Sequence, residues 1–381
     1  YYVALKGNDV TAYSSMKKSI ENYFRDEGLV DLGTYSSTYE QTIQSENLKA
    51  LLYHDYLLED VQSHLKDHEC LLDFYDSSQT KMFVITNNHI SLYDYNEEIL
   101  KDFSHYYHIY ICNDGKTYHM IFEELLETSI SYLSSAKYLL YEHVLTDKQE
   151  IEIIGDIDYD ELYSMHRGEY HSLLFSYYEV STIKNLFKFY ELHHKDVTKE
   201  EFMQITHPYI LHVSAHGEYN DEEDLLDKGS ILLSHGQKVT SQDIMKMNFS
   251  GTALVSLASC YSGVGEDISF EGIYGLRRAF ELAGARTLIL VKDQINDMIA
   301  AAFMSYFYCF YASYDVLDAF DEAKNKIMTM TLNDFDELFR LNETIIKENK
   351  LGFYRRELYQ LINNKALLKK ELNKFMIQGS V

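Results

Sequence analysis

The hydrophobic and polar positions follow a helical rhythm at the start of the chain. Apolar residues recur every three to four positions within residues 16–24 and again within 48–61, which is the spacing of one face of an α-helix. Residues 1–67 are therefore predicted to form a helical lead-in. An isolated helix pair and the last unit of a repeat array both fit this pattern.

The rhythm then changes to short apolar runs separated by turn residues. Three such runs occupy residues 70–75, 81–86 and 90–93, with Asp, Ser and Asn between them. Runs of this length and spacing indicate β-strands joined by tight turns, so we expect an antiparallel meander. A further strand is expected at residues 107–112, because this apolar run ends in the turn signal Asn113-Asp114-Gly115.

From residue 151 onward, short apolar strands alternate with amphipathic helices. The expected strands are residues 151–155, 209–214, 253–258 and 287–291. The expected helices are residues 180–192, 241–247, 272–283 and 298–312. Such alternation is typical of an α/β fold with a mostly parallel sheet covered by helices on both faces. From Ala319 the pattern is helical to the end, so residues 329–381 are predicted to form a helical extension.

Two of these strands end in chemically reactive residues. The first leads into His216-Gly217, and the next leads into Cys260, with Gly263 three residues further on. Alone, such a His is more often structural, and such a Cys is more often a small buried hydrophobe. The carboxyl ends of parallel strands meet at one edge of a sheet, however, and glycines there let a substrate backbone approach closely. The pair therefore indicates a candidate Cys-His site.

The charge and cysteine content narrow the classes of function. The net charge of −26 disfavours direct binding of nucleic acid, and a basic peptide is a more natural partner, although an acidic surface is often only a solubility feature. Four scattered cysteines without a CxxC pair indicate neither a disulfide framework nor a cysteine-rich zinc site. The longest apolar run, residues 299–312, is shorter than the roughly 20 residues that cross a bilayer. We expect a cytoplasmic protein that does not bind membranes.

No metal or cofactor is expected from the remaining motifs. No phosphate-binding GxxxxGK[ST] loop occurs in the sequence. The acidic stretch 219–224 lacks the ligand alternation of an EF-hand and is better interpreted as a solvated loop. His193-His194 and the pair His105 and His108 match metal ligands only in residue type.

The motifs together resemble the CHAT peptidases, which are relatives of caspases and separases. His216-Gly217 after one strand and Ser259-Cys260-Tyr261-Ser262-Gly263 after the next carry the resemblance. Residues 271–280 and 283–287 resemble the family's run of Gly, Leu, Arg and Phe followed by Ala-Gly-Ala-Arg. Upstream, residues 111–115 and 122–125 resemble its "DG" and "PFEAL" segment. The resemblance covers about residues 68–328, which we predict to be a caspase-like domain with the meander in its front half.

This resemblance implies a cysteine endopeptidase that cleaves a protein substrate. It implies that Cys260 is the nucleophile and His216 its acid and base, because a thiol needs a partner to become a thiolate. The backbone N–H groups of Gly217 and Cys260 would form the oxyanion hole. Members of the family are often held idle by an associated sensor or repeat domain, and many act in bacterial defence or programmed death. An activating protein or regulatory domain is therefore expected as a partner.

The sequence departs from the family pattern at three places. Ile121 replaces the usual Pro, and Tyr261-Ser262 replaces the usual Glu-Thr after the nucleophile. Asp293 stands where the family has Trp, while its Asp is kept as Asp297. Related enzymes often read the residue before the scissile bond with an acidic pocket.

Three acidic residues are candidates for such a pocket, namely Asp293, Asp297 and Asp156. They predict cleavage after Arg or Lys. Asp297 has an alternative role as the N-terminal cap of a helix that begins at Met298.

Two rival functions remain open at this level. A catalytically idle module could keep the same fold and only bind partners, although a scaffold needs neither a base nor a thiol at neighbouring strand ends. A small-molecule acyltransferase or hydrolase could use the same Cys-His pair.

Overall fold

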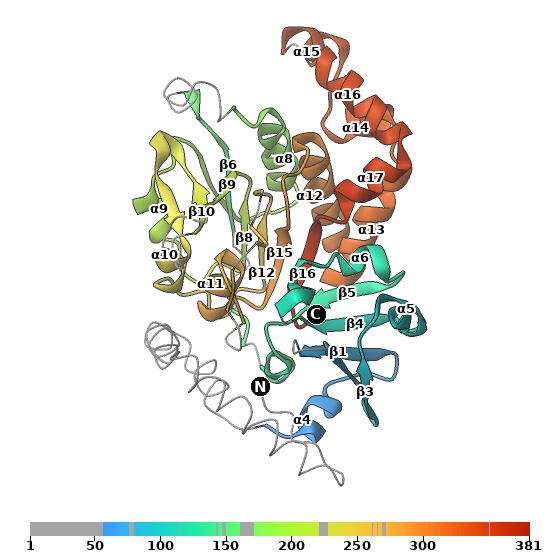
Figure 1. The fold of residues 1–381 in the computed structure, drawn as a ribbon. Helices are drawn as coiled ribbons and strands as arrows, with labels where there is room; N and C mark the ends of the chain where they lie inside the picture. The colour runs from blue at the N-terminus through green and yellow to red at the C-terminus, as the bar shows by residue number, and fades with distance from the viewer. Residues whose placement is uncertain are drawn as a thin grey trace.

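A single broad sheet organises the part of the chain that the structure describes (Figure 1). The computed structural model describes residues 56–381, apart from 76–79, 114, 142–143, 147–149, 161–170, 221–227, 261, 265, 269–271 and 350. Helix α4 (Leu58–Ser63) is the one helix of the predicted lead-in, residues 1–67, that falls within this part. The remainder of that lead-in lies outside the described residues.

The sheet has eleven strands among the described residues, in the order β3-β2-β1-β4-β5-β16-β15-β12-β8-β6-β7. Its first half contains β1 (Glu69–Tyr75), β2 (Lys81–Ile85), β3 (Ile90–Asp94), β4 (His108–Cys112) and β5 (Ser129–Tyr132). Its second half contains β6 (Ile151–Ile157), β7 (Tyr190–Lys195), β8 (Ile210–Val213), β12 (Leu254–Leu257) and β15 (Thr287–Val291). The predicted meander is confirmed, because β1, β2 and β3 pair antiparallel.

Strand β16 (Phe375–Gly379) joins the two halves. It pairs antiparallel with β15, from Thr287 opposite Gly379 to Val291 opposite Phe375, and it pairs parallel with β5. All five of its residues are buried. The prediction of helix to the end of the chain is therefore wrong for these residues, because a short apolar run after a basic helix shows no strand alternation when it is buried on both faces.

Within each half, the other strands beyond the meander are parallel. The pairs β1–β4 and β4–β5 are parallel in the first half. In the second half the pairs β15–β12, β12–β8, β8–β6 and β6–β7 are all parallel. The mostly parallel α/β sheet expected from the sequence is confirmed.

Helices cover both faces of the second half (Figure 1). On one face lie α8 (Leu174–Lys184), α12 (Asp297–Tyr311), α13 (Val316–Thr329), α14 (Leu332–Leu338), α16 (Gly352–Asn363) and α17 (Lys365–Leu372). On the other face lie α9 (Lys199–Met203), α10 (Ser241–Met245) and α11 (Leu276–Leu282). Each face of the sheet has its own hydrophobic core. Along strand β12, Leu254 packs into the core under α8 and α12, whereas Val255 and Leu257 pack into the core under α10 and α11.

Several short elements complete the described structure. A small antiparallel sheet consists of β9 (His216–Tyr219), β10 (Gly229–Leu232) and β11 (Lys238–Thr240), and β13 (Glu266–Ile268) pairs with β14 (Gly272–Tyr274). The other short helices are α5 (Glu97–Leu100), α6 (Phe122–Leu125) and α15 (Glu343–Glu348). The 3-10 helices are η1 (Lys101–Phe103), η2 (Gly115–His119), η3 (Ala136–Leu140) and η4 (Ser234–Gly236).

Two predicted helices have different bounds in the structure. The helix expected at residues 180–192 begins earlier, at Leu174, and ends at Lys184, and residues 190–192 belong to strand β7. The helix expected at 272–283 begins at Leu276, because residues 272–274 form β14. Both errors arise where a short strand directly adjoins a helix with a similar content of apolar residues.

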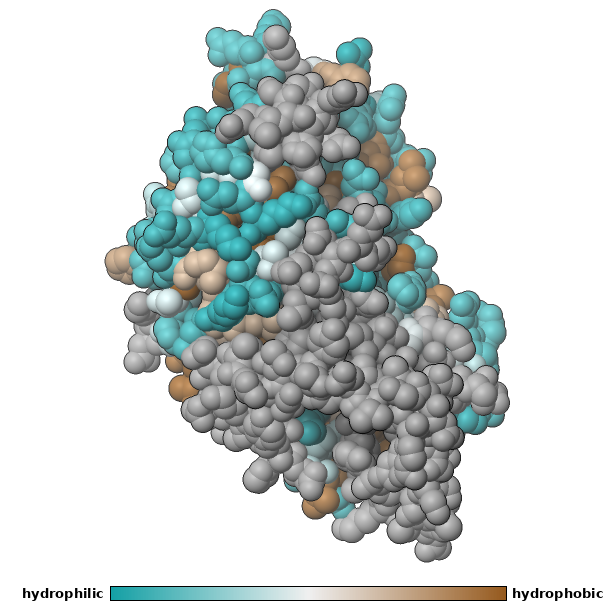
Figure 2. All heavy atoms as spheres, turned by 60° about the vertical axis from the view of Figure 1, so that its left-hand side comes forward, coloured by the Kyte–Doolittle hydropathy of each residue, from teal (hydrophilic) through white to brown (hydrophobic). Residues whose placement is uncertain are grey.

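The described surface is largely polar on the face that Figure 2 brings forward, with only scattered hydrophobic residues. This agrees with the strongly acidic composition of the chain. Within the described residues, no helix combines the length and the apolar character that crossing a membrane requires.

Candidate active site

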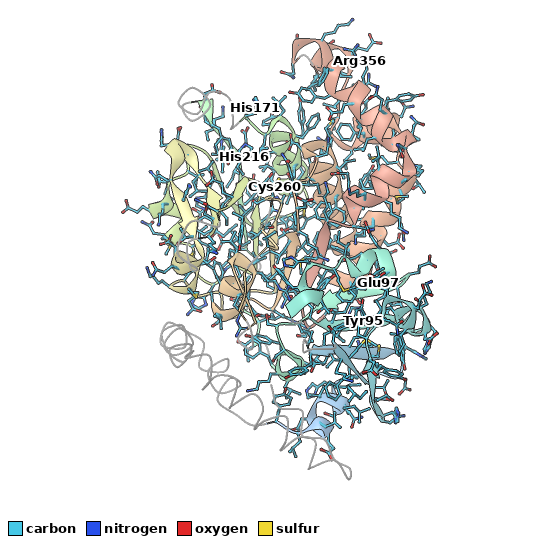
Figure 3. The ribbon with its side chains drawn as sticks, viewed as in Figure 1. Tyr95, Glu97, His171, His216, Cys260 and Arg356 are labelled. Atoms are coloured by element: carbon cyan, nitrogen blue, oxygen red, sulfur yellow. The ribbon has the colours of Figure 1, made fainter. Side chains whose placement is uncertain are left out.

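The two reactive strand ends come into contact. Strands β8 and β12 are parallel neighbours, with Ile210 opposite Leu254 and Val213 opposite Leu257, so the residues that follow them emerge at one edge of the sheet. Gly217 lies directly against Cys260, because a Cβ atom added to Gly217 would lie 2.0 Å from the carbonyl oxygen of Cys260. Figure 3 shows the labelled His216 and Cys260 close together. The structure thus brings together the residues that the sequence proposed as a pair.

The imidazole of His216 is oriented by two groups that sequence reasoning missed. Its Nε2 lies 2.7 Å from the backbone carbonyl oxygen of His171. A carbonyl can only accept a hydrogen bond, so Nε2 carries the proton and, in the neutral ring, Nδ1 is the basic nitrogen. The ring of Tyr159 packs edge-to-face on the imidazole, with ring centroids 4.7 Å apart.

Tyr159 also holds the backbone of this segment. Its hydroxyl accepts a hydrogen bond from the backbone N–H of His216 at 3.1 Å and donates one to the carbonyl of Leu232 at 2.9 Å. Tyr159 follows strand β6, so its place beside a strand end was a usable sequence signal. His171 acts through its backbone, which any residue type supplies, so no sequence signal could have identified it.

Burial opposes charge on both members of the pair. It lowers the pKa of His216, and the His171 carbonyl and Glu218 only partly offset this effect. Burial also raises the pKa of the Cys260 thiol. The Ile295 backbone and the charge of Lys374 favour the thiolate and offset this rise only in part. Both directions favour the neutral forms of the thiol and of the imidazole at rest, and a thiolate forms only when the proton moves to a base.

A buried polar network lies beneath the two strand ends. The Ser256 hydroxyl lies 2.8 Å from His212 Nδ1 and 2.6 Å from the Tyr308 hydroxyl. Glu179 Oε2 accepts a hydrogen bond from Ser214 at 2.7 Å, and Glu179 Oε1 lies 3.1 Å from His212 Nε2. The side chains of His212 and Glu179 are 0% and 1% exposed. The network ties β8 and β12 to helices α8 and α12 directly below the site.

Asp156 lies at the carboxyl end of β6 in a strained conformation, with φ of 54°. Its backbone N–H donates a hydrogen bond of 2.8 Å to the Ser176 hydroxyl. It lines a pocket of about 530 Å³ together with Asp158, Asp160 and Tyr177. Ser172, next to His171, also borders this pocket, which therefore adjoins the segment that orients His216.

Asp297 lies close to the same part of helix α8. Its Oδ2 accepts a hydrogen bond of 3.2 Å from the backbone N–H of Phe175, the neighbour of Ser176. Helix α12 begins at Asp297, and the side chain of Asn296 caps it by accepting from the N–H groups of Met298 and Ile299. The alternative role of Asp297 as the helix cap is therefore wrong, because the cap lies one residue earlier.

Asp293 lies apart from the other two candidates. It is exposed, its carboxylate accepts a hydrogen bond from the N–H of Gln294, and it lines a second pocket with Lys292. The structure therefore places Asp156 and Asp297 beside the start of α8 and separates them from Asp293. Their roles toward a substrate stay predictions.

We predict that Asp297→Asn stabilises the protein at alkaline pH. Burial raises the pKa of Asp297 to about 7, well above the value near 3.9 of an unfolded Asp. Between these values the folded state binds more protons, so this group makes the free energy of unfolding fall as the pH rises toward 7. In urea unfolding, Asp297→Asn should raise the free energy of unfolding more at pH 8 than at pH 5. An equal gain at both values would contradict a raised pKa.

One group among the described residues has the composition of a metal site. The possible ligand atoms of Glu152, Glu191 and His193 all lie within 4.8 Å of one another. His193 Nε2 lies 2.8 Å from Glu152 Oε2, and this hydrogen bond is the main cause of a raised pKa of His193. The ion pair accounts for the cluster, which lies in the amino-terminal half of β6 and not at the site. The acidic stretch 219–224 lies mostly outside the described residues.

Comparisons with known proteins identify one family and several solved structures that this chain resembles. The family described as "CHAT domain" matches residues 119–339, more than half of the chain. Among solved structures, the chain resembles the Arg-specific cysteine proteinase gingipain R, with a TM-score of 0.43 and 9% identity, over 74% of this chain and 66% of that one. It also resembles the chain in the complex of Porphyromonas gingivalis RgpB pro- and mature domains, with a TM-score of 0.41 and 9% identity, over 72% and 64%.

A third structure of this kind is the Saccharomyces cerevisiae separase–securin complex, with a TM-score of 0.40 and 12% identity, over 72% of this chain and 16% of that one. The chain thus spans just under two thirds of the gingipain chain and a much smaller share of the separase structure. No curated protein matches the sequence.

Proposed function

Because this chain belongs to the CHAT domain family, we propose that it is a cysteine endopeptidase that cleaves a protein substrate with Cys260 and His216. The observation that carries the proposal is the direct contact between Gly217 and Cys260, which brings the histidine segment and the nucleophile to one edge of the sheet. The hydrogen bond from His216 Nε2 to the His171 carbonyl supports it, because it leaves Nδ1 as the base.

The proposed reaction has two stages. His216 takes the proton of the Cys260 thiol as the sulfur attacks the scissile carbonyl carbon, and the C–S bond forms. His216 then protonates the leaving amine as the C–N bond breaks, and an acyl-enzyme remains. In the second stage His216 takes a proton from water, the hydroxide attacks the acyl carbon, the C–S bond breaks, and His216 returns the proton to the sulfur as the acid product leaves. The N–H groups of Gly217 and Cys260 would hold the oxyanion, and losing one such donor typically costs about 3 kcal/mol.

The pKa shifts of Cys260 and His216 support the proposal that the enzyme is regulated. The pKa of Cys260 is raised and that of His216 is lowered, and both directions disfavour the reactive ion pair. Substrate or a regulatory protein that excludes water and adds positive charge near the sulfur would favour the thiolate. We propose that an activating protein or domain supplies this change.

The pocket beside Asp156 supports cleavage after a basic residue. It is lined by Asp156, Asp158 and Asp160, with Lys195 as the opposing charge, and its volume of about 530 Å³ accommodates an Arg or Lys side chain. A guanidinium ion pairs with carboxylates through two hydrogen bonds, so Arg would be preferred over Lys.

We expect a panel of fluorogenic peptides to be cleaved fastest after Arg or Lys. Because Asp156 lines the pocket, Asp156→Asn should lower kcat/KM for the Arg peptide by about 10- to 100-fold, the effect of removing one charged partner. Asp293→Asn is the matched control, since Asp293 lines a different pocket, and it should retain the preference. Faster cleavage after Leu than after Arg in the unmodified protein would reject the acidic pocket.

A further inference from the structure

A second pocket lies beside the junction of the two halves of the sheet. It has a volume of about 210 Å³ and includes Met376 of β16 and Lys292 at the end of β15. Four cationic side chains and the carboxylate of Asp293 line it, and the cations are Arg277, Lys292, Lys370 and Lys374. A gathering of cations is unexpected in a chain with a net charge of −26.

Arg277 is buried in this pocket, and two of its guanidinium nitrogens have no hydrogen-bonding partner among the described residues. The residue is 2% exposed, and its Nε and Nη2 atoms form no hydrogen bond with the described part of the protein. Its Cζ atom lies over the ring of Tyr132, 5.6 Å from the ring centroid, so the guanidinium makes a cation–π contact in place of hydrogen bonds from Nε and Nη2. Arg278, the next residue of α11, is bonded to Glu281 at 2.8 Å. Burying an unpaired guanidinium costs free energy, which a bound anion would recover.

Asn113 presents a second unsatisfied group in the same pocket. It is 8% exposed, and neither its amide nitrogen nor its amide oxygen has a partner within the described structure. The amide can donate hydrogen bonds to an anion and accept one from a protonated oxygen. Lys292 forms a salt bridge with Glu123 at 2.7 Å, and Lys374 forms one with Glu371 at 2.6 Å. The positive charges of these two lysines are therefore partly balanced.

We propose that this pocket is a binding site for a small anionic ligand that carries a carboxylate or a phosphate group. Arg277 offers two N–H groups in the fork geometry that matches both anions. Asn113 adds a neutral donor, and the exposed Lys370 adds positive charge. The volume limits the ligand to a small molecule or to one group of a larger one.

The pocket is connected to the segment that carries the nucleophile. Lys374 Nζ donates to the carbonyl of Gln294 at 2.5 Å, and the backbone of the next residue, Ile295, stabilises the sulfur of Cys260. Gly263 lines the pocket, and the Tyr118 hydroxyl donates to its carbonyl at 3.2 Å. A bound anion would neutralise part of the positive charge near the sulfur. It should therefore slow reactions of the thiolate, an effect that rests on the proposed function.

Thermal unfolding of the Cys260→Ala protein tests binding independently of catalysis. Inorganic phosphate, acetate and chloride are compared at constant ionic strength, so that phosphate and carboxylate are separated from general salt effects. We expect a saturable rise in Tm of a few degrees with phosphate, acetate or both. Arg277→Met should abolish this rise and should not lower the Tm of the ligand-free protein, because it removes an unpaired buried charge.

Arg356→Met is the matched control, since it also removes one positive charge, and its exposed guanidinium lies on α16 (Figure 3). The Arg356→Met variant should show the same rise in Tm with phosphate or acetate as the Cys260→Ala protein. Lys370→Met, a change of an exposed residue with little risk to folding, should raise the half-saturating phosphate concentration severalfold. The absence of a saturable rise with either anion would overturn the site, as would a full response in both Arg277→Met and Lys370→Met.

The coupling is tested in the protein with Cys260 intact and Cys309→Ala. Saturating anion should slow alkylation of Cys260 by iodoacetamide about twofold or more. An unchanged rate would overturn the coupling. A failure to cleave peptides would count against the proposed function alone, because the Tm measurement does not depend on cleavage.

Discussion

Cys260→Ala is expected to abolish peptide cleavage and to remove the site of labelling by a peptidyl acyloxymethyl ketone. No other group replaces the sulfur, since the three remaining cysteines, Cys70, Cys112 and Cys309, lie on other elements. His216→Ala should lower kcat/KM by roughly 10²- to 10⁴-fold, the usual contribution of a general acid and base. Because Cys309 is exposed, labelling is best measured in a Cys309→Ala background, which should itself be fully active.

The pH dependence of labelling gives a further check. Because the pKa of Cys260 is raised above its usual range, the rate of alkylation by iodoacetamide should still increase between pH 7 and pH 9. A rate that is already constant at pH 7 would contradict a neutral resting thiol. An absence of both labelling and cleavage would favour the idle interaction module.

Gly217→Ala is expected to reduce kcat/KM by at least about 100-fold, comparable to the loss of one oxyanion donor. The added Cβ would lie 2.0 Å from the carbonyl oxygen of Cys260, so the backbone at the nucleophile or at the histidine must move. Overpacking of this kind typically lowers the free energy of unfolding by about 1–3 kcal/mol. Kinetics and urea unfolding of the same variant would separate the two effects.

Gly352→Ala provides the matched control for this substitution. An added Cβ at Gly352, the first residue of α16, meets no atom within 4 Å. It should leave activity unchanged and raise the free energy of unfolding slightly, because Ala limits the unfolded chain more than Gly does. Normal activity in Gly217→Ala would show that the close contact is not needed for catalysis.

The parts of the site that depend on local sequence could be predicted, and the parts that depend on distant backbone could not. The apolar strand before Cys260 and the glycine after His216 are local patterns, and the structure brings their ends together. The His171 carbonyl is a backbone group and leaves no trace in residue type. The sequence predicts helix ends only to within a few residues, so Asp297 is a possible cap by sequence, whereas Asn296 fills that role in the structure.

The same limit applies to the fold. Strands β1 and β2 are predictable because they are apolar runs separated by turn residues, and β12 and β15 are predictable because they are apolar runs that alternate with amphipathic helices. Strand β16 was missed because Asn373-Lys374 follows a basic helix directly, without Gly or Pro to mark the change. Its place depends on pairing with β15 and β5, which are far away in the sequence.

The central position of β16 imposes an order on synthesis. The strand before Cys260 emerges from the ribosome about 120 residues ahead of Gly379, which is roughly 6–24 s at ordinary translation rates. During this interval β15 has one open edge where β16 will pair, and the two halves of the sheet are linked only through the chain. A product that terminates before Phe375 would therefore contain Cys260 and His216 but would lack the strand that joins the two halves of the sheet.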